Sequence, residues 1–522
     1  MLSRMTTTQR WTMVVAILGS AIVFLDGTIV NVALQRIGAE LPATIVGVLE
    51  GQTYITSGYL ATLAALLILA GALADFYGRR RIFAIGLAGF GVSSVLCGLA
   101  PSLELLAIFR VLQGATGALL VPGSLSIITA TFEGPARARA FGIWASATSA
   151  TTLLGPVVGG VLVDVVSWRA AFLANVPLVA LGLYATIRYL EESRDETASG
   201  RFDWLGAILV AFAVGGLAFG AIRGQENEWR DGLAFAALGL GVVCTLAFPI
   251  LMGRRPNPLV PLSLFRIRPF AVINLSTLLI YGALYGAFGF QSLFLQGALG
   301  YTALATGLVG IPTSVLLTTL SARVGSVAGR IGVRPFLTVG PFVMAAGLAW
   351  WARIPPSSEG WRANLAEPAS LLPTGSVILD VLPAVLLFGI GISLVVAPLT
   401  SALMSSIPVR NAGLGSAINN AISRVGQPLL AAVIFIVVSG SFYTTLAERV
   451  PGLDPSAPEV RAAVQPLNRP APGTDARIAE AARVASTDAY RLAMVVGVAL
   501  LVAGGLTNWV GLRDRPAGRQ PG

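Results

Sequence analysis

The chain has 522 residues, of which 55% are hydrophobic and only 11% are charged, with a mean hydropathy of +0.78 and a net charge of +10. A soluble globular domain carries about 25% charged residues, so this chain has too little polar surface to cover itself in water. Its apolar stretches repeatedly reach the roughly 20 residues that cross a bilayer as a helix. The composition predicts an α-helical membrane protein, in which the positive charge sets orientation and does not indicate binding of nucleic acid.

The residue types that are missing narrow the chemistry. The chain contains no histidine and no lysine, so all 35 basic residues are arginine. Proton relays and metal sites built on histidine are therefore excluded, and proton coupling would require a carboxylate. Cys97 and Cys244 lie in separate apolar spans and are expected to be small buried hydrophobes. We expect no metal, no cofactor and no enzyme active site.

Apolar segments predict about fourteen membrane-spanning helices. The first follows Arg4 and Arg10 as a signal peptide would, but it is too long for one and contains Asp26. The predicted spans are residues 11–35, 53–74, 82–100, 104–128, 141–163, 169–190, 204–222, 232–252, 269–296, 302–322, 335–352, 378–404, 412–440 and 489–511. An even number of spans places both termini on one side of the membrane.

The loops between the spans indicate orientation. Arginines gather in alternate loops, for example at Arg79–Arg81 and Arg137–Arg139, and the positive-inside rule then places both termini in the cytoplasm. Two longer outer segments, Arg353–Val377 and Phe442–Thr487, are rich in Pro, Ser and Ala and are expected to be loops. Within the second, Asp475–Ala485 is a candidate for a short surface helix.

Three ionisable residues lie far from the ends of the predicted spans: Asp26 in the first, Arg110 in the fourth and Arg424 in the thirteenth. Charge inside a membrane is costly and commonly marks a transport pathway. Asp26 is the only carboxylate at this depth, and a carboxylate whose water access or neighbouring charge changes can exchange a proton against a substrate. The alternative is that Asp26 is a permanently ionised structural partner of Arg110.

Helical spacing places amide side chains beside both arginines. Gln113 lies three residues after Arg110, while Asn420 and Gln427 lie four before and three after Arg424. Each set shares one helix face. These faces indicate either a pathway for substrate and protons or structural pairs that hold the helices together.

The inner end of the second span combines small and charged residues: Gly71, Asp75, Gly78, Arg79 and Arg80. Gly78 allows a tight turn, Asp75 can cap the N-terminus of a neighbouring helix, and the arginines can pair with Asp75. A simple positively charged inner loop would explain the arginines but not the spaced glycines and aspartate.

The fifth span places a proline among small residues, at Gly155, Pro156, Gly159 and Gly160. The proline predicts a kink, and the small residues suit close contact with another helix. On its own, this pattern is weak evidence for a function.

The ninth span carries an aromatic stripe of Tyr281, Tyr285 and Phe288 at helical spacing. The stripe could line a pocket for lipophilic cations, although plain packing explains it as well.

Taken together, the motifs resemble those of the fourteen-span drug:proton antiporter family (multidrug efflux type) of the major facilitator superfamily. Five segments follow the order of that family: Leu25–Leu34, Gly71–Arg81, Arg110–Gly114, Gly155–Gly160 and Trp168–Pro177. No single segment is specific, but their order and spacing are. Two positions depart from the family pattern, because Gln35 replaces its usual proline and Thr151 a frequent glycine of its antiporter motif.

The resemblance implies an all-α membrane protein with the major facilitator fold, two six-helix bundles plus two inserted helices. The N-terminal bundle would occupy residues 11–190, the linker and inserted helices 191–268, the C-terminal bundle 269–511 and a cytoplasmic tail 512–522. It further implies that Asp26 binds a proton or cation, that Arg110 helps to exchange the proton, and that Asp75, Arg79 and Arg80 latch a cytoplasmic gate. Gly155, Pro156, Gly159 and Gly160 would seal the bundle against leaks.

The function expected from the resemblance is proton-coupled export of amphipathic drug-like molecules by alternating access. The alternative on the same fold is an exporter or flippase-like transporter of an endogenous lipid or metabolite. We expect a monomer in the plasma (inner) membrane that interacts with the lipid bilayer, protons and a small-molecule substrate. Neither a channel nor a receptor fits as well, because the sequence has no ring-forming repeat and no sizeable soluble domain.

Overall fold

The computed structural model describes residues 5–42, 48–194, 202–226, 229, 231–364, 367–471 and 473–513, and this part of the chain is helical with no β-strand. The long helices are α1 (Thr7–Glu40), α2 (Val48–Tyr77), α3 (Arg79–Gly98), α4 (Leu103–Gly117), α5 (Leu120–Thr131), α6 (Gly134–Val161), α8 (Asn175–Tyr189), α9 (Trp204–Glu226), α10 (Gly232–Arg254), α12 (Arg268–Gly297), α13 (Ala303–Ile331), α14 (Arg334–Trp351), α15 (Leu382–Ser405), α16 (Ala412–Arg449) and α18 (Ala476–Gly511). The short helices are α7 (Trp168–Leu173), α11 (Ser263–Arg266) and α17 (Pro458–Ala463), with single turns at Leu162–Val166, Pro368–Leu371, Val377–Val381 and Val409–Asn411.

Among the described residues, twelve stretches are long and apolar enough to cross a membrane. Helices suit this environment because they satisfy every backbone hydrogen bond within one segment. Two further long helices, α6 with 28 residues and α14 with 18, pack beside these twelve. The prediction of an all-α membrane protein is confirmed, while the exact count of fourteen spans stays a prediction.

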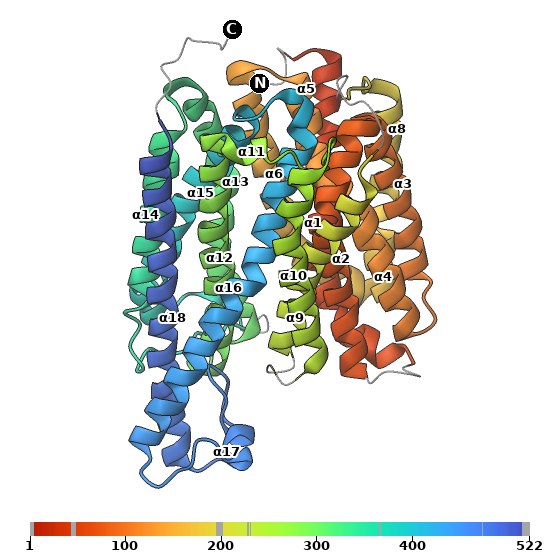
Figure 1. The fold of residues 1–522 in the computed structure, drawn as a ribbon. Helices are drawn as coiled ribbons and strands as arrows, with labels where there is room; N and C mark the ends of the chain where they lie inside the picture. Colours follow the sequence, from red (N-terminus) through yellow and green to blue (C-terminus); the bar gives the residue numbers. More distant parts are fainter. Residues whose placement is uncertain are drawn as a thin grey trace.

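The long helices pack in two groups, with one helix pair between them (Figure 1). In the first group α1 packs against α5, α6 and α8, and α4 packs against α2 and α3. In the second group α12 packs against α16 and α18, and α14 against α15 and α18. Helices α9 and α10 pair with each other, and α9 lies against α2 of the first group and α16 of the second.

The α9–α10 pair is held by small residues and by capping at its ends. A Cβ atom at Gly216 would lie 2.7 Å from the carbonyl oxygen of Ala237, so the two backbones touch. At one end Asp203 accepts hydrogen bonds from the backbone N–H groups of Gly206 (3.0 Å) and Leu259 (3.2 Å). These bonds tie the start of α9 to the segment that follows α10.

At the other end of the pair, Asp231 caps α10 and pairs with Arg223 of α9. The Leu233 N–H group and the Arg223 guanidinium lower the pKa of the Asp231 carboxyl. Because this pKa is lowered, the ionised cap stabilises the fold fully at pH values above the ordinary carboxyl pKa. This stabilisation is lost only as the pH falls through the lowered value. The capping interaction of Asp231 and its ion pair with Arg223 are therefore intact at neutral pH.

Helix α1 begins and α18 ends at the same end of the molecule, which we call the inner end, opposite α17 (Figure 1). The two groups touch each other toward the inner end. A Cβ at Gly142 of α6 would lie 2.9 Å from the Cα of Ala322 of α13, and one at Gly71 of α2 would lie 2.8 Å from the carbonyl carbon of Gly413 of α16. Such backbone-to-backbone contacts leave no space for water or substrate between the two groups at these points.

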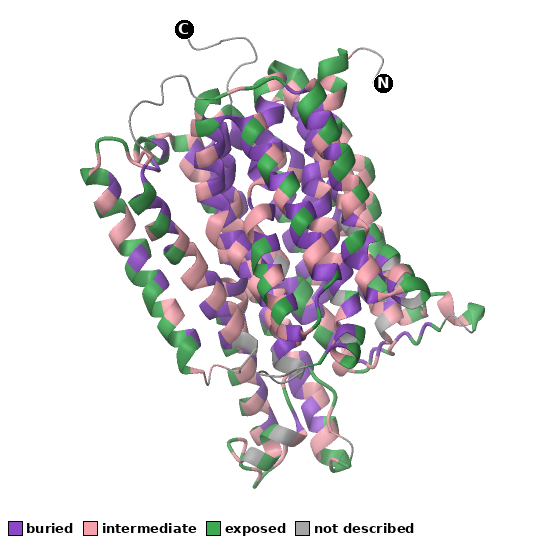
Figure 2. Cartoon of the chain, turned by 90° about the vertical axis from the view of Figure 1, so that its right-hand side faces the viewer, coloured by how far each residue is buried: buried purple, intermediate pink, exposed green. Residues whose placement is uncertain are grey.

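Buried residues gather between the helices, and exposed residues follow their outer faces (Figure 2). Many of the exposed residues are large and apolar, such as Val243 and Leu246 of α10, which are 64% and 66% exposed. Continuous apolar surface of this kind is unfavourable in water and marks a face that contacts lipid.

The outer segment Phe442–Thr487 corrects the expectation of a loop. Helix α16 continues to Arg449, and α18 already begins at Ala476, so the two helices extend past the other spans as a hairpin that carries α17 (Figure 1). Buried Leu446 and Ala485 are part of the core cluster that continues into this hairpin. The predicted surface helix Asp475–Ala485 exists, but as the first turns of the 36-residue α18.

Candidate functional site

The first candidate site is an ion pair inside the first helix group. Asp26 of α1 is 0% exposed and Arg110 of α4 is 1% exposed, and the Arg110 Nη1 atom donates to the Asp26 carboxylate. The structure thus brings together two of the three charges that the sequence places within the membrane. A buried ion pair is costly unless its remaining hydrogen-bonding capacity is satisfied.

Amide side chains satisfy most of that capacity. Gln113, one turn after Arg110, accepts from Arg110 Nη1 (2.8 Å) and donates to Asp26 Oδ1 (3.0 Å) and to the Ser94 hydroxyl (2.8 Å). Asn175, at the start of α8, donates to the same Asp26 oxygen (3.0 Å). Three helices, α1, α4 and α8, therefore meet at the Asp26 carboxylate, and Ser94 adds α3 to the same hydrogen-bond network.

Aromatic rings cover the guanidinium. The Arg110 Cζ atom lies 4.0 Å from the centre of the Tyr59 ring and 5.8 Å from that of Phe172. Arg110 Nε also donates to the carbonyl of Ile55 (3.1 Å). Cation–π contacts of this kind gain strength when water is excluded, as it is here.

Sequence reasoning identified Asp26, Arg110 and Gln113 but missed several of their partners. Ser94, Asn175 and Tyr59 were not predicted, and Cys97, expected to be an inert hydrophobe, lies with its Sγ 3.6 Å from Gln113 Oε1. A usable signal was present, since Asn175 is an amide within the apolar sixth span. Which neighbour each of these residues meets depends on helix rotation, which spacing alone does not give.

The hydrogen-bond network ties the Asp26–Arg110 ion pair to the packing of α1, α3, α4 and α8. If Asp26 were neutral, Arg110 would remain charged without a counter-ion in an environment from which water is excluded. The cost would be several kcal/mol, on the order of that for removing one partner of a buried ion pair. The Oδ1 atom of Asn175 is buried with no hydrogen-bond partner among the described residues, so it can accept a bond when the cluster rearranges.

The second candidate site is the contact between α2 and α16. Asp75 of α2 accepts from the backbone N–H groups of Gly413 (3.1 Å) and Leu414 (2.8 Å) at the start of α16. Arg79 pairs with Asp75 at 2.9 Å and donates to the carbonyl of Val409. Asp75 therefore caps a helix of the other group, as the sequence predicted, and the carboxylate also suits the positive end of that helix.

Gly78 and Arg80 stay within the first group. Gly78 has φ +111°, which favours glycine, and a Cβ there would lie 2.6 Å from the Glu192 carboxyl group. Glu192 in turn accepts from the backbone N–H groups of Arg80 (3.0 Å) and Arg81 (3.1 Å). The Arg80 side chain donates to the carbonyl of Ile187 (2.6 Å), so it does not reach α16 as Arg79 does.

The small residues of α6 face α1. A Cβ at Gly155 would lie 2.8 Å from Thr28 Cβ, and one at Gly159 would lie 3.1 Å from Ile29 Cα. The side-chain surroundings of Pro156 and Gly160 fall outside the described part of the chain. Close packing of α6 on α1, two turns or fewer from Asp26 along α1, agrees with the predicted small-residue contact.

The predicted residues of the second group do not join the Asp26 cluster. Asn420 is half-buried and donates to the carbonyl of Ser416 in its own helix (2.9 Å). Arg424 and Gln427 are also half-buried on α16, and Arg424 forms no ion pair or hydrogen bond with the residues that the structure describes. Tyr281 packs against the apolar core, and the Tyr285 side chain lies outside the described part.

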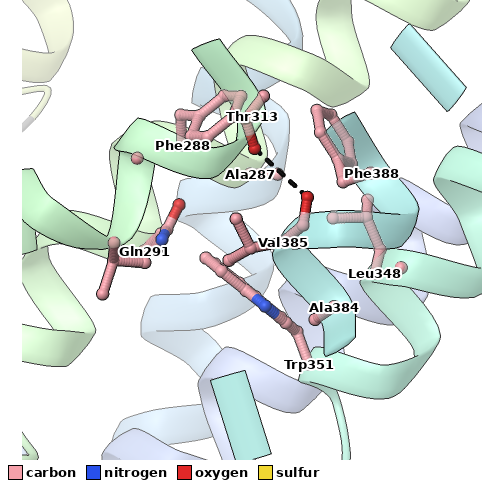
Figure 3. A pocket seen from close by; sticks show the side chains of 12 residues that line it. Ala287, Phe288, Gln291, Thr313, Leu348, Trp351, Ala384, Val385 and Phe388 are labelled. Atoms are coloured by element: carbon pink, nitrogen blue, oxygen red, sulfur yellow. Dashed lines mark hydrogen bonds between the residues drawn. The ribbon is translucent and has the colours of Figure 1, made fainter. Parts of the chain in front are cut away.

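A small apolar cavity lies within the second group (Figure 3). Phe288 of α12 and Phe388 of α15 meet edge to face across it at 5.3 Å, and Gln291 and Trp351 lie at its other side. Its volume of about 20 Å³ holds roughly one water molecule. Of the predicted aromatic stripe, Phe288 thus lines a cavity, but one too small for a drug-like molecule in this conformation.

Two helix groups that touch at one end, with an ion pair buried inside the first and a helix-capping aspartate between them, define a helical transporter. The chain belongs to the Major Facilitator Superfamily, whose family model matches residues 16–431. Its predicted fold class is thereby confirmed, together with its nature as a multi-pass membrane protein that acts on small molecules.

Several relatives of this chain are resistance proteins. The multidrug resistance protein Stp of Mycobacterium tuberculosis is 34% identical over 87% of this chain and 80% of its own length. The tetracenomycin C resistance and export protein of Streptomyces glaucescens is 31% identical over 82% of this chain and 76% of its own length. The human organic anion transporter MFSD10 shares the fold, with a TM-score of 0.60 and 15% identity over 96% of this chain and all of that one.

Proposed function

We propose that this protein is a proton-coupled exporter of amphipathic drug-like molecules that works by alternating access. The resistance proteins to which it is similar support the export of drugs, and the buried Asp26–Arg110 cluster supports coupling to protons. The observation that carries the proposal is that Asp26, the one mid-membrane carboxylate among the described residues of the first six spans, is held by an arginine and two amides from two other helices, α4 and α8. Such a group can exchange a proton when those helices move.

In this proposal residues 11–190 and 269–511 are the two moving bundles, and 191–268 contains the inserted helices. The contacts at the inner end close the cytoplasmic side, so this conformation corresponds to one that opens outward. Both termini lie in the cytoplasm, and the protein acts as a monomer in the plasma membrane. It is a transporter without an enzymatic step, and it requires no cofactor.

The test is efflux of a fluorescent dye from proteoliposomes under an imposed proton gradient, with Asp26→Asn compared to wild type. We expect gradient-driven efflux in wild type and its loss in Asp26→Asn. Asp454→Asn is a matched control because Asp454 is an exposed outer carboxylate that bonds only Ser456 nearby. Efflux that survives Asp26→Asn would remove Asp26 from the coupling role.

The rival function, export of an endogenous lipid or metabolite, makes a different prediction in the same assay. A folded wild-type protein that moves no dye under any gradient would favour that cargo. A fluorescent phospholipid offered in the same vesicles then tests whether the cargo is a lipid.

A further inference from the structure

Arg424 is the one intramembrane charge of the three that no other described residue neutralises. Asp26 and Arg110 cancel each other within the first group, whereas Arg424 has no ion pair among the described residues. A single uncompensated cation at this depth costs several kcal/mol unless it meets water or an anion. Its position must therefore give access to one or the other.

The packing of α16 shows where Arg424 points. Gly413 and Ala417 of α16 contact Gly71 of α2, and Arg424 continues this same helix face two turns farther from the inner end. Arg424 thus lies on the side of α16 that faces the first group.

The surrounding helices supply no counter-charge. Helices α5, α12 and α15, which all pack against α16, contain no aspartate or glutamate. Of the remaining neighbours, α2 carries Asp75 near its inner end and Glu50 near its outer end, α9 ends at Glu226, and α18 carries Glu480 and Asp488 near its outer end. No carboxylate of these helices lies at the depth of Arg424.

The face around Arg424 is polar and offers hydrogen bonds. Asn420 and Gln427 lie one turn before and after it, and both are half-buried. Gln427 forms no hydrogen bond with another described residue. An arginine flanked by amides is a geometry suited to a carboxylate, phosphate or other anionic group, since guanidinium binds such groups with paired hydrogen bonds.

We propose that Arg424 binds the anionic group of an amphipathic substrate at the interface between the two helix groups. This inference rests on the proposed export function and narrows its substrate class to molecules that join an apolar body to an anionic group. The apolar body would contact the helix faces around α16, while Asp26, already paired with Arg110, remains available for the proton. The anionic group can belong to a soluble molecule or to a lipid headgroup.

The experiment uses the full-length protein in proteoliposomes and two forms of one dye: a rhodamine with a free carboxylate and its ethyl ester. Proton-gradient-driven efflux is measured against dye concentration for wild type, Arg424→Gln and Arg424→Lys. We expect Arg424→Gln to raise the KM of the carboxylate dye about tenfold or more, because the variant lacks one charge-assisted hydrogen-bonding group. The KM of the ethyl ester should stay unchanged. For Arg424→Lys, which keeps the charge, the KM of the carboxylate dye should lie between those of wild type and Arg424→Gln.

Arg449→Gln is the matched control, because Arg449 ends the same helix on the outer side. Equal losses for both dyes in Arg424→Gln would overturn the proposal and assign Arg424 to coupling or folding. Fluorescence titration of the purified variants with the carboxylate dye keeps the test independent of transport: unchanged affinity in Arg424→Gln overturns it as well. Wild type that binds the dye through Arg424 but shows no gradient-driven efflux would instead contradict the proposed function.

A lipid arm separates the two sources of the anion. Vesicles carry fluorescent phosphatidylglycerol or phosphatidylcholine, and movement between leaflets is followed by quenching from outside. Arg424-dependent movement of phosphatidylglycerol alone places the anionic group on a lipid headgroup, and Arg424-dependent efflux of the dye alone places it on a soluble substrate. If neither the efflux of the carboxylate dye nor the movement of phosphatidylglycerol depends on Arg424, the proposed anion site is rejected.

Discussion

Gln113 is the residue that bonds both members of the buried ion pair, Arg110 and Asp26. Its amide bonds Arg110, Asp26 and Ser94 at once, with all four groups buried. Replacing it by leucine leaves the carboxylate and the guanidinium each one bond short in a dry environment. We expect Gln113→Leu to lower the free energy of unfolding by about 1–3 kcal/mol, measured as a lower midpoint of thermal unfolding in detergent.

The control for this variant is Gln296→Leu. Gln296 lies in a span of the second group and bonds only Ser292, one turn away in its own helix and partly buried. Its loss should change the unfolding midpoint little. Equal shifts of the unfolding midpoint in the two leucine variants would mean that Gln113 contributes no more to stability than a partly buried amide such as Gln296.

At the scale of residues, the sequence identified the buried charges Asp26 and Arg110 but not most of the side chains around them. Arg110 and Gln113 could be placed together because both lie on one face of one helix, a relation fixed by the 3.6-residue repeat. Asn175 comes from α8 and Ser94 from α3, and Asn175 bonds both Asp26 and Ser94 only because of how these helices rotate against α1. That rotation is a property of tertiary packing, which hydropathy does not encode.

The contact between α2 and α16 gives a prediction at the scale of elements. Gly71 lets the two backbones approach, because any side chain there would meet the carbonyl of Gly413. We expect Gly71→Leu to separate the two groups at the inner end and so favour conformations open to that side. Spin labels at exposed Arg81 and Ile331, one in each group, would report a longer distance in the variant.

Gly239→Leu provides the comparison for that measurement. A Cβ at Gly239 of α10 meets no atom within 4 Å, so the new side chain projects into the lipid. This variant should keep the wild-type label distance. An unchanged distance in Gly71→Leu would show that Asp75, through its bonds to Gly413 and Leu414, holds the closed state without close backbone packing.

Elements were predicted well where hydrophobicity alone decides and poorly where it does not. The spans of the first group agree with helices α1 to α8, because apolar runs of membrane length have few alternatives. The outer hairpin of α16 and α18 was missed, because its residues are polar and alanine-rich and give no apolar run. There the helix continues through capping by Asp475 and through contacts such as that of Phe442 with Tyr443.

At the scale of the whole molecule, the inserted pair α9–α10 is attached to the first group more closely than to the second. Arg223 of α9 donates to the Tyr54 hydroxyl of α2 (2.8 Å), and Phe202, just before α9, packs against Phe76 and Tyr77 at the other end of α2. A Cβ at Gly215 would lie 2.9 Å from Ala65 Cβ in the middle of the same contact. Helix α9 is thus held to α2 at three levels and should move with it.

This attachment predicts opposite effects for two engineered disulfides of similar geometry. Ala138→Cys with Gly329→Cys joins α6 of the first group to α13 of the second, where the Cβ separation would be 3.0 Å. Ala65→Cys with Gly215→Cys joins α2 to α9 at 2.9 Å. Both separations are slightly below the roughly 3.5–4.5 Å of a relaxed disulfide, so small shifts allow either bond.

We expect oxidation of the α6–α13 pair to stop transport and reduction to restore it, because alternating access requires the two groups to part at the inner end. Oxidation of the α2–α9 pair should leave transport close to that of the reduced protein, since it joins elements that already move as one. Dye efflux from proteoliposomes before and after a thiol reductant measures both, with cross-linking followed by mass spectrometry. Arrest by the α2–α9 bond would mean that the inserted pair slides against α2 during each cycle, and the gate would then include α9 and α10 as well as the two bundles.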